Sequence, residues 1–317
     1  MEVDVEKRLR RIEEALDHLK ENDRDCKLCP RACRVNREAG ERGFCRAGIR
    51  PKVFRHAAHH GEEPPISGTK GSGTVFFSHC TMRCIYCQNH RFSQLDQGRE
   101  LSSAELCEVF FDLQDQGCHN INLVTPTQFM PWILEALNLA YGAGLSLPIV
   151  YNTSSYETTG LIETLEGIID IYLADIRYAD PVLAREYSNA PDYVARSREA
   201  LKAMWHATGP LVLDADGIAS RGLIIRHLVL PGHSENTRAS LNWIAEGLST
   251  DVAVSLMGQY RPAYKALEHQ ILSRRITAEE YAAAFEIAQE LDFETLFIQP
   301  SEAEFPDELF GGRMQET

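Results

Sequence analysis

Residues 76–87 read FFSHCTMRCIYC and place three cysteines, Cys80, Cys84 and Cys87, on one short stretch of chain. Thiolates are the soft ligands that hold iron–sulfur clusters, and a cluster of four irons normally takes four of them. Three cysteines on one loop hold three irons and leave the fourth open to a ligand that reacts. The C-x3-C-x2-C spacing, with the aromatic Tyr86 directly before the last cysteine, therefore predicts a 4Fe-4S cluster with one open corner.

Two other interpretations of these three cysteines compete with the cluster. They could be ligands of a structural zinc ion, or buried thiols that bind nothing. Zinc ligands usually come as a C-x2-4-C pair followed by a second, distant pair, and no second pair follows this loop closely. The spacing favours the cluster over both alternatives.

The flanking sequence resembles one branch of the radical S-adenosylmethionine (SAM) superfamily, the pyruvate formate-lyase activating enzyme-like iron–sulfur proteins. The matching stretches are GEEPPISG (61–68), GSGTVFFS (71–78), CQNH (87–90), NLVTPT (122–127), YLADIRY (172–178), RGLIIRHLVLP (221–231) and SLMGQY (255–260). The resemblance runs from about Cys26 to Gln299. This resemblance indicates specific cofactors but says little about which substrate the protein acts on.

This resemblance implies an oxidoreductase reaction. The open iron chelates the amino and carboxylate groups of SAM, and the reduced cluster gives one electron to the sulfonium. Methionine leaves, and a 5'-deoxyadenosyl radical takes a hydrogen atom from a substrate. In the activating enzymes the substrate is a glycine of a partner protein, and the electron comes from a donor such as a flavodoxin or a ferredoxin.

Two other functions stay open. One is a radical SAM enzyme that acts on a small molecule or on a residue other than glycine, which shares every cofactor motif. The other is a non-catalytic metal-binding scaffold, which would need no SAM pocket. The polar residues at the predicted strand ends argue against the scaffold.

Length and composition are typical of a single enzyme domain with a full core, at 317 residues, 44% hydrophobic and 25% charged. No apolar run approaches the roughly 18 residues of a membrane span, and the first residues, MEVDVEK, are charged rather than signal-like. We therefore expect no membrane association and a cytoplasmic location. Nine cysteines in that compartment indicate metal or redox chemistry. The net charge of -14 argues against nucleic acid as a partner.

From Thr74 onward, short apolar runs alternate with amphipathic stretches, which predicts βα units around a parallel sheet. The expected strands are 74–78, 120–124, 148–152, 168–173, 223–230, 251–256 and 296–299. The expected helices include 103–116, opened by a capping box of Ser102 with Glu105, and 130–141, 193–207, 236–248 and 278–291. Six or so repeats are too few for a closed eight-stranded barrel. The predicted fold is α/β, a partial (β/α)6-type barrel resembling that of radical SAM enzymes.

Five segments are predicted along the chain. Residues 1–25 form an amphipathic helix, because apolar residues from Val5 to Leu19 are spaced 4-3-4-3, and this helix packs on its own domain. The others are a Cys-rich metal-binding segment (26–50), an irregular linker (51–73), the barrel (74–300) and a C-terminal tail (301–317).

Four more cysteines precede the barrel, namely Cys26, Cys29, Cys33 and Cys45. Four thiolates are a full ligand set for a structural zinc ion or for an auxiliary iron–sulfur cluster, and the spacing fits both. So small a segment could hardly fold without a metal. The sequence predicts a second metal site here and leaves the choice between zinc and iron–sulfur open.

Polar residues at the predicted strand ends are the candidate SAM contacts, because the active site of a parallel βα fold gathers at the carboxyl ends of its strands. Cys80 follows the first predicted strand directly, so the cluster belongs at that face. The candidate cofactor-binding residues are Tyr86, Thr125, Asn152, Ser154, Asp175, Arg177 and His227.

The chain departs from the family pattern at two of these strand ends. Relatives often carry Gly-Gly-Glu-Pro against the methionine amino group, whereas residues 124–127 read VTPT, so Thr125 would act through its hydroxyl or its carbonyl. Asp175-Ile176-Arg177 stands where relatives carry Asp-x-Lys, and Arg keeps the cation without the point-charge geometry of Lys. Asn or Ser after a strand is also an ordinary turn residue, and Asp175 could simply cap the next segment.

Overall fold

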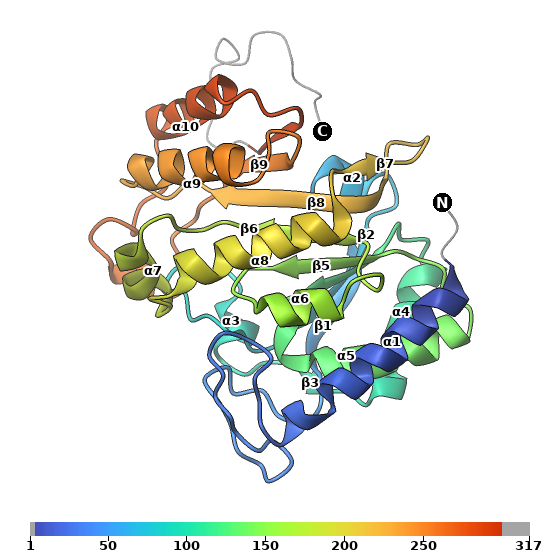
Figure 1. Cartoon of the computed structure of the whole chain (residues 1–317). Coiled ribbons are helices and arrows are strands. Elements are labelled where there is room, and N and C mark those ends of the chain that lie inside the picture. Colours follow the sequence, from blue (N-terminus) through green and yellow to red (C-terminus); the bar gives the residue numbers. More distant parts are fainter. Residues whose placement is uncertain (1–3, 300–317) are drawn as a thin grey trace. The chain divides into compact units, whose positions relative to one another are not determined.

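The computed structural model describes residues 4–299, which divide into two compact units (Figure 1). The first unit takes in the chain up to Arg83, Asn89–Ala174 and Ala195–Leu223. The second takes in Cys84–Gln88, Asp175–Val194 and the chain from Ile224 onward.

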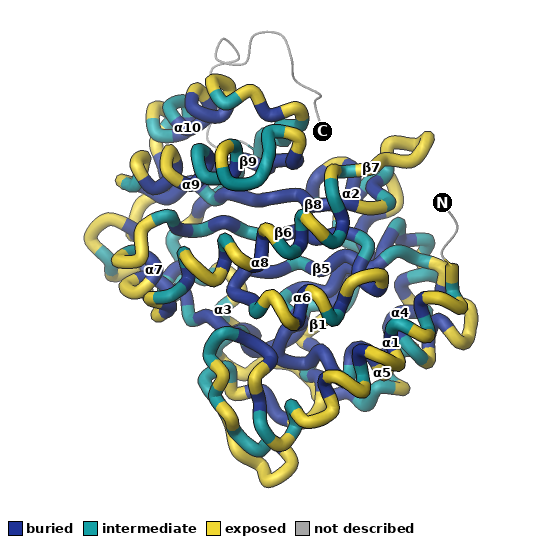
Figure 2. Tube along the Cα trace, viewed as in Figure 1, coloured by how far each residue is buried: buried dark blue, intermediate teal, exposed yellow. Residues whose placement is uncertain are grey.

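A twisted sheet with the strand order β3-β1-β2-β4-β5-β6 forms the centre of the first unit. Its parallel strands are β2 (Ser72–Phe77), β4 (Ile121–Val124), β5 (Ile149–Thr153) and β6 (Ile171–Asp175). They are nearly continuous buried runs (Figure 2), as expected for parallel strands that are covered on both faces. The strands β1 (Lys52–His59) and β3 (Arg99–Glu100) extend the sheet in antiparallel fashion.

Helices connect these strands, and the sequence predicts three of them, at 103–116, 130–141 and 193–207. The connecting helices are α4 (Ser103–Asp115), α5 (Met130–Gly142), α6 (Thr159–Thr164) and α8 (Tyr193–Thr208), with the short α2 (Pro64–Ser67) and α3 (His90–Ser93) before them. The predicted capping box opens α4, where Ser102 Oγ accepts from the Glu105 backbone N–H at 3.2 Å and the Glu105 carboxylate accepts from Ser102 N–H at 2.8 Å.

The predicted N-terminal helix is α1 (Val5–Leu19), which buries Ile12, Ala15 and Leu19 and packs on α5. It is followed by a 3-10 turn, Lys20–Asp23. The buried guanidinium of Arg8 donates to both carboxylate oxygens of Asp170, at 2.9 and 2.6 Å. Asp170 also accepts the Ile149 backbone N–H at 2.8 Å. One carboxylate thus joins the helix to the start of β5.

The second unit holds β9 (Ala253–Met257) between β8 (Ala219–Leu228) and β10 (Leu296–Gln299), with all three strands parallel. Its helices are α7 (Pro181–Ser188), α9 (Ser234–Gly247) and α10 (Ala278–Glu290), with a 3-10 turn at Tyr264–Glu268. The strand β8 begins in the first unit, where β7 (Val212–Leu213) pairs with it. Because β3 and β10 each have one neighbouring strand, the sheet is not closed, as predicted.

The structure differs from the sequence-based expectation at residues 51–73. This stretch was expected to be an irregular linker, but it contains β1 and α2. The strand β1 gains its order by pairing with β2, while its own side chains are mostly half-buried or exposed and show no clean alternation. The predicted tail, 301–317, lies outside the described residues. No helix within residues 4–299 is long and apolar enough to cross a membrane.

Candidate functional site

The ends of the parallel strands in the first unit bring three predicted site residues to one edge. Cys80 follows β2, Thr125 follows β4 and Asn152 lies near the end of β5, and these strands are parallel neighbours in register. Thr125 has a left-handed backbone (φ 53°), and its N–H donates to the Asn152 carbonyl at 2.9 Å. Ser154 comes directly after β5 and is buried.

The sulfur of Cys80 already receives a hydrogen bond. The backbone N–H of Met82 lies 3.4 Å from Cys80 Sγ. Hydrogen bonds to sulfur stabilise a thiolate and tune the potential of a cluster. The loop geometry around Cys80 therefore fits a metal-bound thiolate.

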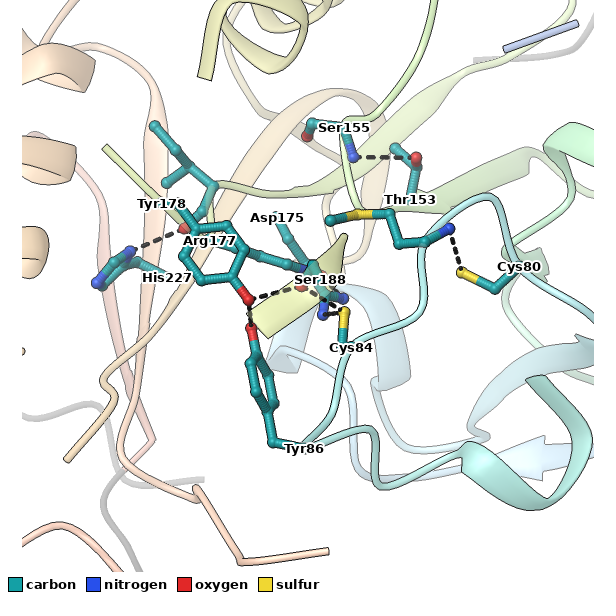
Figure 3. A network of polar contacts seen from close by, with 12 residues as sticks. Cys80, Cys84, Tyr86, Thr153, Ser155, Asp175, Arg177, Tyr178, Ser188 and His227 are labelled. Carbon is teal, nitrogen blue, oxygen red and sulfur yellow. Dashed lines mark hydrogen bonds and ion pairs between the residues drawn. The ribbon is translucent and has the colours of Figure 1, made fainter. Parts of the chain in front are cut away.

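In the second unit, Cys84 receives two side-chain donors (Figure 3). Ser188 Oγ donates to Cys84 Sγ at 2.9 Å, and Arg177 Nη1 donates to the same sulfur at 3.4 Å. Hydrogen-bond donors of this kind are the outer contacts that orient and tune a metal-bound thiolate. The sequence analysis did not identify Ser188, which comes from α7, and nothing in its local sequence marks it.

Arg177 and Asp175 lie together, as the Asp-x-Arg pattern suggests. Arg177 Nη2 forms an ion pair with Asp175 Oδ2, and the side chains are 26% and 22% exposed. Burial alone would lower the pKa of Arg177, but the Asp175 carboxylate and the Cys84 thiol outweigh it and raise the pKa well above its ordinary value. Arg177 Nε has no hydrogen-bond partner among the described residues. A fixed cation with one spare donor can bind a carboxylate.

Tyr86 is buried and supports the cysteine loop through a hydrogen bond, rather than lying on an accessible surface. Its hydroxyl lies 2.6 Å from the Tyr178 hydroxyl, which lies 2.6 Å from Ser188 Oγ, so a hydrogen-bonded chain runs from Tyr86 to Cys84 (Figure 3). Burial raises the pKa of both tyrosines, which stay neutral donors. The spacing of the motif predicts Tyr86 but cannot reveal Tyr178.

His227, a predicted cofactor contact, forms hydrogen bonds within the protein through both of its ring nitrogens. The ring is fully buried, and burial lowers its pKa to about 4. Nδ1 lies 2.8 Å from the Ile176 carbonyl, which can only accept, so Nδ1 carries the proton. Nε2 then accepts from Thr237 Oγ1 at 3.0 Å. Both ring nitrogens are occupied, so the structure does not offer His227 to a ligand.

Glu157, which the sequence analysis missed, lies buried beyond the end of β5. One carboxylate oxygen accepts from Thr127 Oγ1 at 2.7 Å and from Thr153 Oγ1 at 2.6 Å. The other oxygen has no partner among the described residues. Burial raises the pKa of Glu157 to about 7, although hydrogen bonds from Thr153, Thr127 and Tyr151 favour the charged form. This carboxyl joins the loops after β4 and β5, and only the folded chain shows that they meet.

The N-terminal cysteines gather around one small cavity in the first unit. Its lining includes Cys26, Cys29, Cys33 and Cys45, and also Arg31 and Arg37. None of the nine cysteines, all of which lie within the described residues, forms a disulfide. Within residues 4–299, however, no three His, Cys, Asp or Glu side chains already stand close enough together to hold a metal ion.

Comparison with known proteins finds no family model that matches. The chain is 30% identical over 285 residues to the uncharacterized protein MJ0674 of Methanocaldococcus jannaschii, covering 86% of this chain and 77% of that protein.

Two solved structures are weakly similar in fold. Streptococcus suis SuiB, solved with its precursor peptide SuiA, has a TM-score of 0.49 and 11% identity over 74% of this chain. HydG, a maturase of the [FeFe]-hydrogenase, has a TM-score of 0.48 and 15% identity over 73% of this chain. The chain spans 52% of the length of each. Function must therefore be inferred from the residues of the chain.

Proposed function

We propose that this chain, which belongs to the same family as MJ0674 of Methanocaldococcus jannaschii, is a radical SAM enzyme. The observation that carries the proposal is the C-x3-C-x2-C loop, which follows the first parallel strand and in which Cys80 and Cys84 each accept a hydrogen bond at sulfur. When bound to Cys80, Cys84 and Cys87, a 4Fe-4S cluster supplies the electron that cleaves SAM into methionine and a 5'-deoxyadenosyl radical.

The residues of the chain would bind and orient SAM. Arg177 offers the charge of its partly exposed guanidinium to the methionine carboxylate, and the ion pair with Asp175 holds the guanidinium in place. Thr125, Asn152 and Ser154 supply polar groups at the ends of β4 and β5. Tyr86 acts indirectly, through the hydrogen-bonded chain that ends at Cys84.

For the substrate, the activating-enzyme-like flanks favour hydrogen abstraction from a glycine of a partner protein. A small molecule or a different residue is the second candidate, since it needs the same cofactor motifs. We also propose that a protein of the flavodoxin or ferredoxin kind donates the electron. We further propose a second metal site at the N-terminal cysteines and a cytoplasmic location, which suits nine cysteines without a disulfide.

The test is anaerobic reconstitution with iron and sulfide, reduction, and incubation with SAM. We expect 5'-deoxyadenosine from the wild type and from Cys107→Ala, a control that removes a thiol of α4 outside both cysteine sets. The triple variant Cys80→Ala, Cys84→Ala and Cys87→Ala should form none. If the triple variant made as much 5'-deoxyadenosine as the wild type, the proposal would be refuted.

A further inference from the structure

The segment between the 3-10 turn that ends at Asp23 and the start of β1 at Lys52 contains no helix or strand. Ala32, Arg34 and Arg46, none of them glycine, have left-handed backbones with φ of 40°, 59° and 66°. Such conformations cost energy and persist only where the surroundings enforce them. An irregular segment of this length needs an internal cross-link, such as a bound metal ion, to hold one conformation.

The cavity among the four cysteines has the volume that one ion requires. It measures about 10 Å³. Roughly 10–15 Å³ on this measure accommodates a single water molecule. A cubane of four irons and four sulfides needs far more room. The cavity therefore separates two alternatives that the cysteine spacing leaves open.

Charge provides an independent argument. Arg37 is 4% exposed and lines the cavity. The half-buried Asp23 carboxylate interacts with it electrostatically, but no ion pair joins the two within residues 4–299. Its Nη2 donates to Cys26 Sγ at 3.1 Å and lies 3.9 Å from Cys45 Sγ, while its Nε has no partner in the described chain. A buried guanidinium needs an anion beside it. The Nη2 of Arg37 faces the sulfurs of Cys26 and Cys45, so metal-bound thiolates at these two positions would give Arg37 an anion to contact.

Arg31 adds a second cation to the same lining. Its guanidinium lies over the Phe44 ring at 3.7 Å, and its Nη2 has no partner among the described residues. Four thiolates around one Zn²⁺ carry 2 − 4 = −2 charges, and Arg31 and Arg37 together carry +2. Both arginines are therefore placed as counter-ions for a tetrathiolate metal centre, while the choice of a single ion rests on the size of the cavity.

A backbone donor adds to this arrangement. The Phe44 N–H donates to Cys33 Sγ at 3.4 Å. Outer donors of this kind orient thiolate ligands and are part of a metal site.

We infer that Cys26, Cys29, Cys33 and Cys45 bind a single Zn²⁺ ion, and that this ion holds the loop that carries Cys80. Binding requires the four side chains to turn toward the cavity, because the sulfurs are not yet gathered at bonding distance. The site itself is independent of the proposed function, whereas its role in holding the loop rests on that function.

Two arginines connect the ion site to the loop. Arg37 Nη1 donates to the Gln128 carbonyl at 2.5 Å, and the Gln128 side chain donates to the carbonyls of Ser78 and Thr125 at 3.0 and 2.8 Å. Arg31 Nε donates to the Thr81 carbonyl at 3.1 Å. Loss of the ion would leave both arginines without an anion, and their hydrogen bonds to the residues on either side of Cys80 would weaken.

The test uses the full chain with Cys84→Ala and Cys87→Ala, which cannot hold the open-corner cluster but keeps Cys80. We expect one zinc per chain, no sulfide, and an X-ray absorption spectrum with four sulfur ligands at about 2.3 Å. Adding Cys29→Ser should abolish zinc binding, and adding Cys107→Ser should not. Iron with sulfide in this variant, or the absence of any metal, would overturn the inference. Neither result bears on SAM cleavage by the wild type.

Hydrogen exchange tests the role of the ion. In the same double variant, removal of zinc should make the amides of residues 78–83 exchange about five- to tenfold faster, the effect of losing about one hydrogen bond. The amides of β5, in the same unit, should be unchanged and serve as the reference. Equal exchange of residues 78–83 with and without zinc would show that the ion does not hold this loop.

Discussion

Arg177 and Cys84 are in direct contact, with Nη1 of the arginine 3.4 Å from Sγ of the cysteine. The same guanidinium pairs with Asp175, the last residue of β6. The cation at this strand end is therefore attached to the cysteine loop, and a carboxylate bound by Arg177 would lie beside a cluster ligand.

Replacing Arg177 with Ala should weaken SAM binding to the cluster-loaded protein by roughly 1.5–3 kcal/mol, the range for a lost charge-assisted hydrogen bond. Arg177→Lys keeps the positive charge but lacks the planar guanidinium that can donate two parallel hydrogen bonds. Its affinity for SAM should therefore lie between those of the wild type and of Arg177→Ala. Isothermal calorimetry measures the affinities, and Arg185→Ala, on an exposed residue of α7, is the control. Wild-type affinity with unchanged iron content in Arg177→Ala would remove this residue from the site.

Ser188→Ala should make the cluster harder to reduce. The substitution removes the hydroxyl that donates to Cys84 Sγ at 2.9 Å, and such hydrogen bonds stabilise the more negative, reduced state. A hydrogen bond of about 0.5–1.5 kcal/mol corresponds to a potential lower by roughly 20–60 mV. Redox titration followed by electron paramagnetic resonance gives the value, with the exposed Ser146→Ala as the control. An unchanged or more positive potential would contradict the role of Ser188.

Glu157→Gln should change the pH dependence of stability. Burial raises the pKa of Glu157 from 4.5 to about 7, so the folded state binds this proton more tightly than the unfolded state does. The stabilisation is complete below pH 4.5 and is lost as the pH rises through 7, by about 3 kcal/mol in total. Gln cannot titrate, so the variant should gain about this much relative to the wild type between pH 4.5 and 8.

Urea unfolding of both proteins across this pH range makes the comparison, with Glu163→Gln on α6 as the matched control. Parallel pH profiles for wild type and Glu157→Gln would show that this carboxyl does not titrate in the folded protein as we expect.

Gly43→Ala should destabilise the first unit by about 1–3 kcal/mol, because a Cβ at residue 43 would meet the Cβ and Sγ of Cys33 at 2.9 and 3.0 Å. Gly142→Ala on α5 is the matched control, since its Cβ would meet nothing within 4 Å. There the substitution should be neutral or stabilising by up to about 1 kcal/mol. Thermal unfolding of the zinc-loaded protein distinguishes the two, and equal melting temperatures would exclude the close approach of Gly43 to Cys33.

Local pattern was sufficient to predict the parallel strands, because each is a short apolar run and inner strands such as β4 and β5 are buried almost throughout. The strand predicted at 296–299 is β10 with identical bounds, and those predicted at 120–124 and 148–152 are β4 and β5 within one residue at each end. The strand β1 was missed because its order comes from pairing with β2 rather than from its own pattern.

The candidate site was only partly predictable for a similar reason. A motif such as C-x3-C-x2-C, or Asp175-Ile176-Arg177, lies within a few residues and is visible in the sequence. Ser188 meets Cys84 across 104 residues, and Glu157 meets Thr127 across 30. Such contacts depend on tertiary packing. His227 shows the limit in the other direction, since its place on a strand predicts a cofactor contact but cannot reveal that both ring nitrogens form hydrogen bonds within the core.

The pairing of Arg8 with Asp170 also has a consequence for biosynthesis. The two residues are 162 positions apart, and an isolated helix of 15 residues, the length of α1, is only marginally stable. At about 5–20 residues per second, a ribosome needs roughly 8–30 s to reach Asp170 after Arg8. During that time Arg8 has no carboxylate partner, and until residue 142 has been made the apolar residues of α1 lack the helix α5 on which they pack. The nascent chain therefore carries an unpacked apolar segment that chaperones can bind before the first unit is complete.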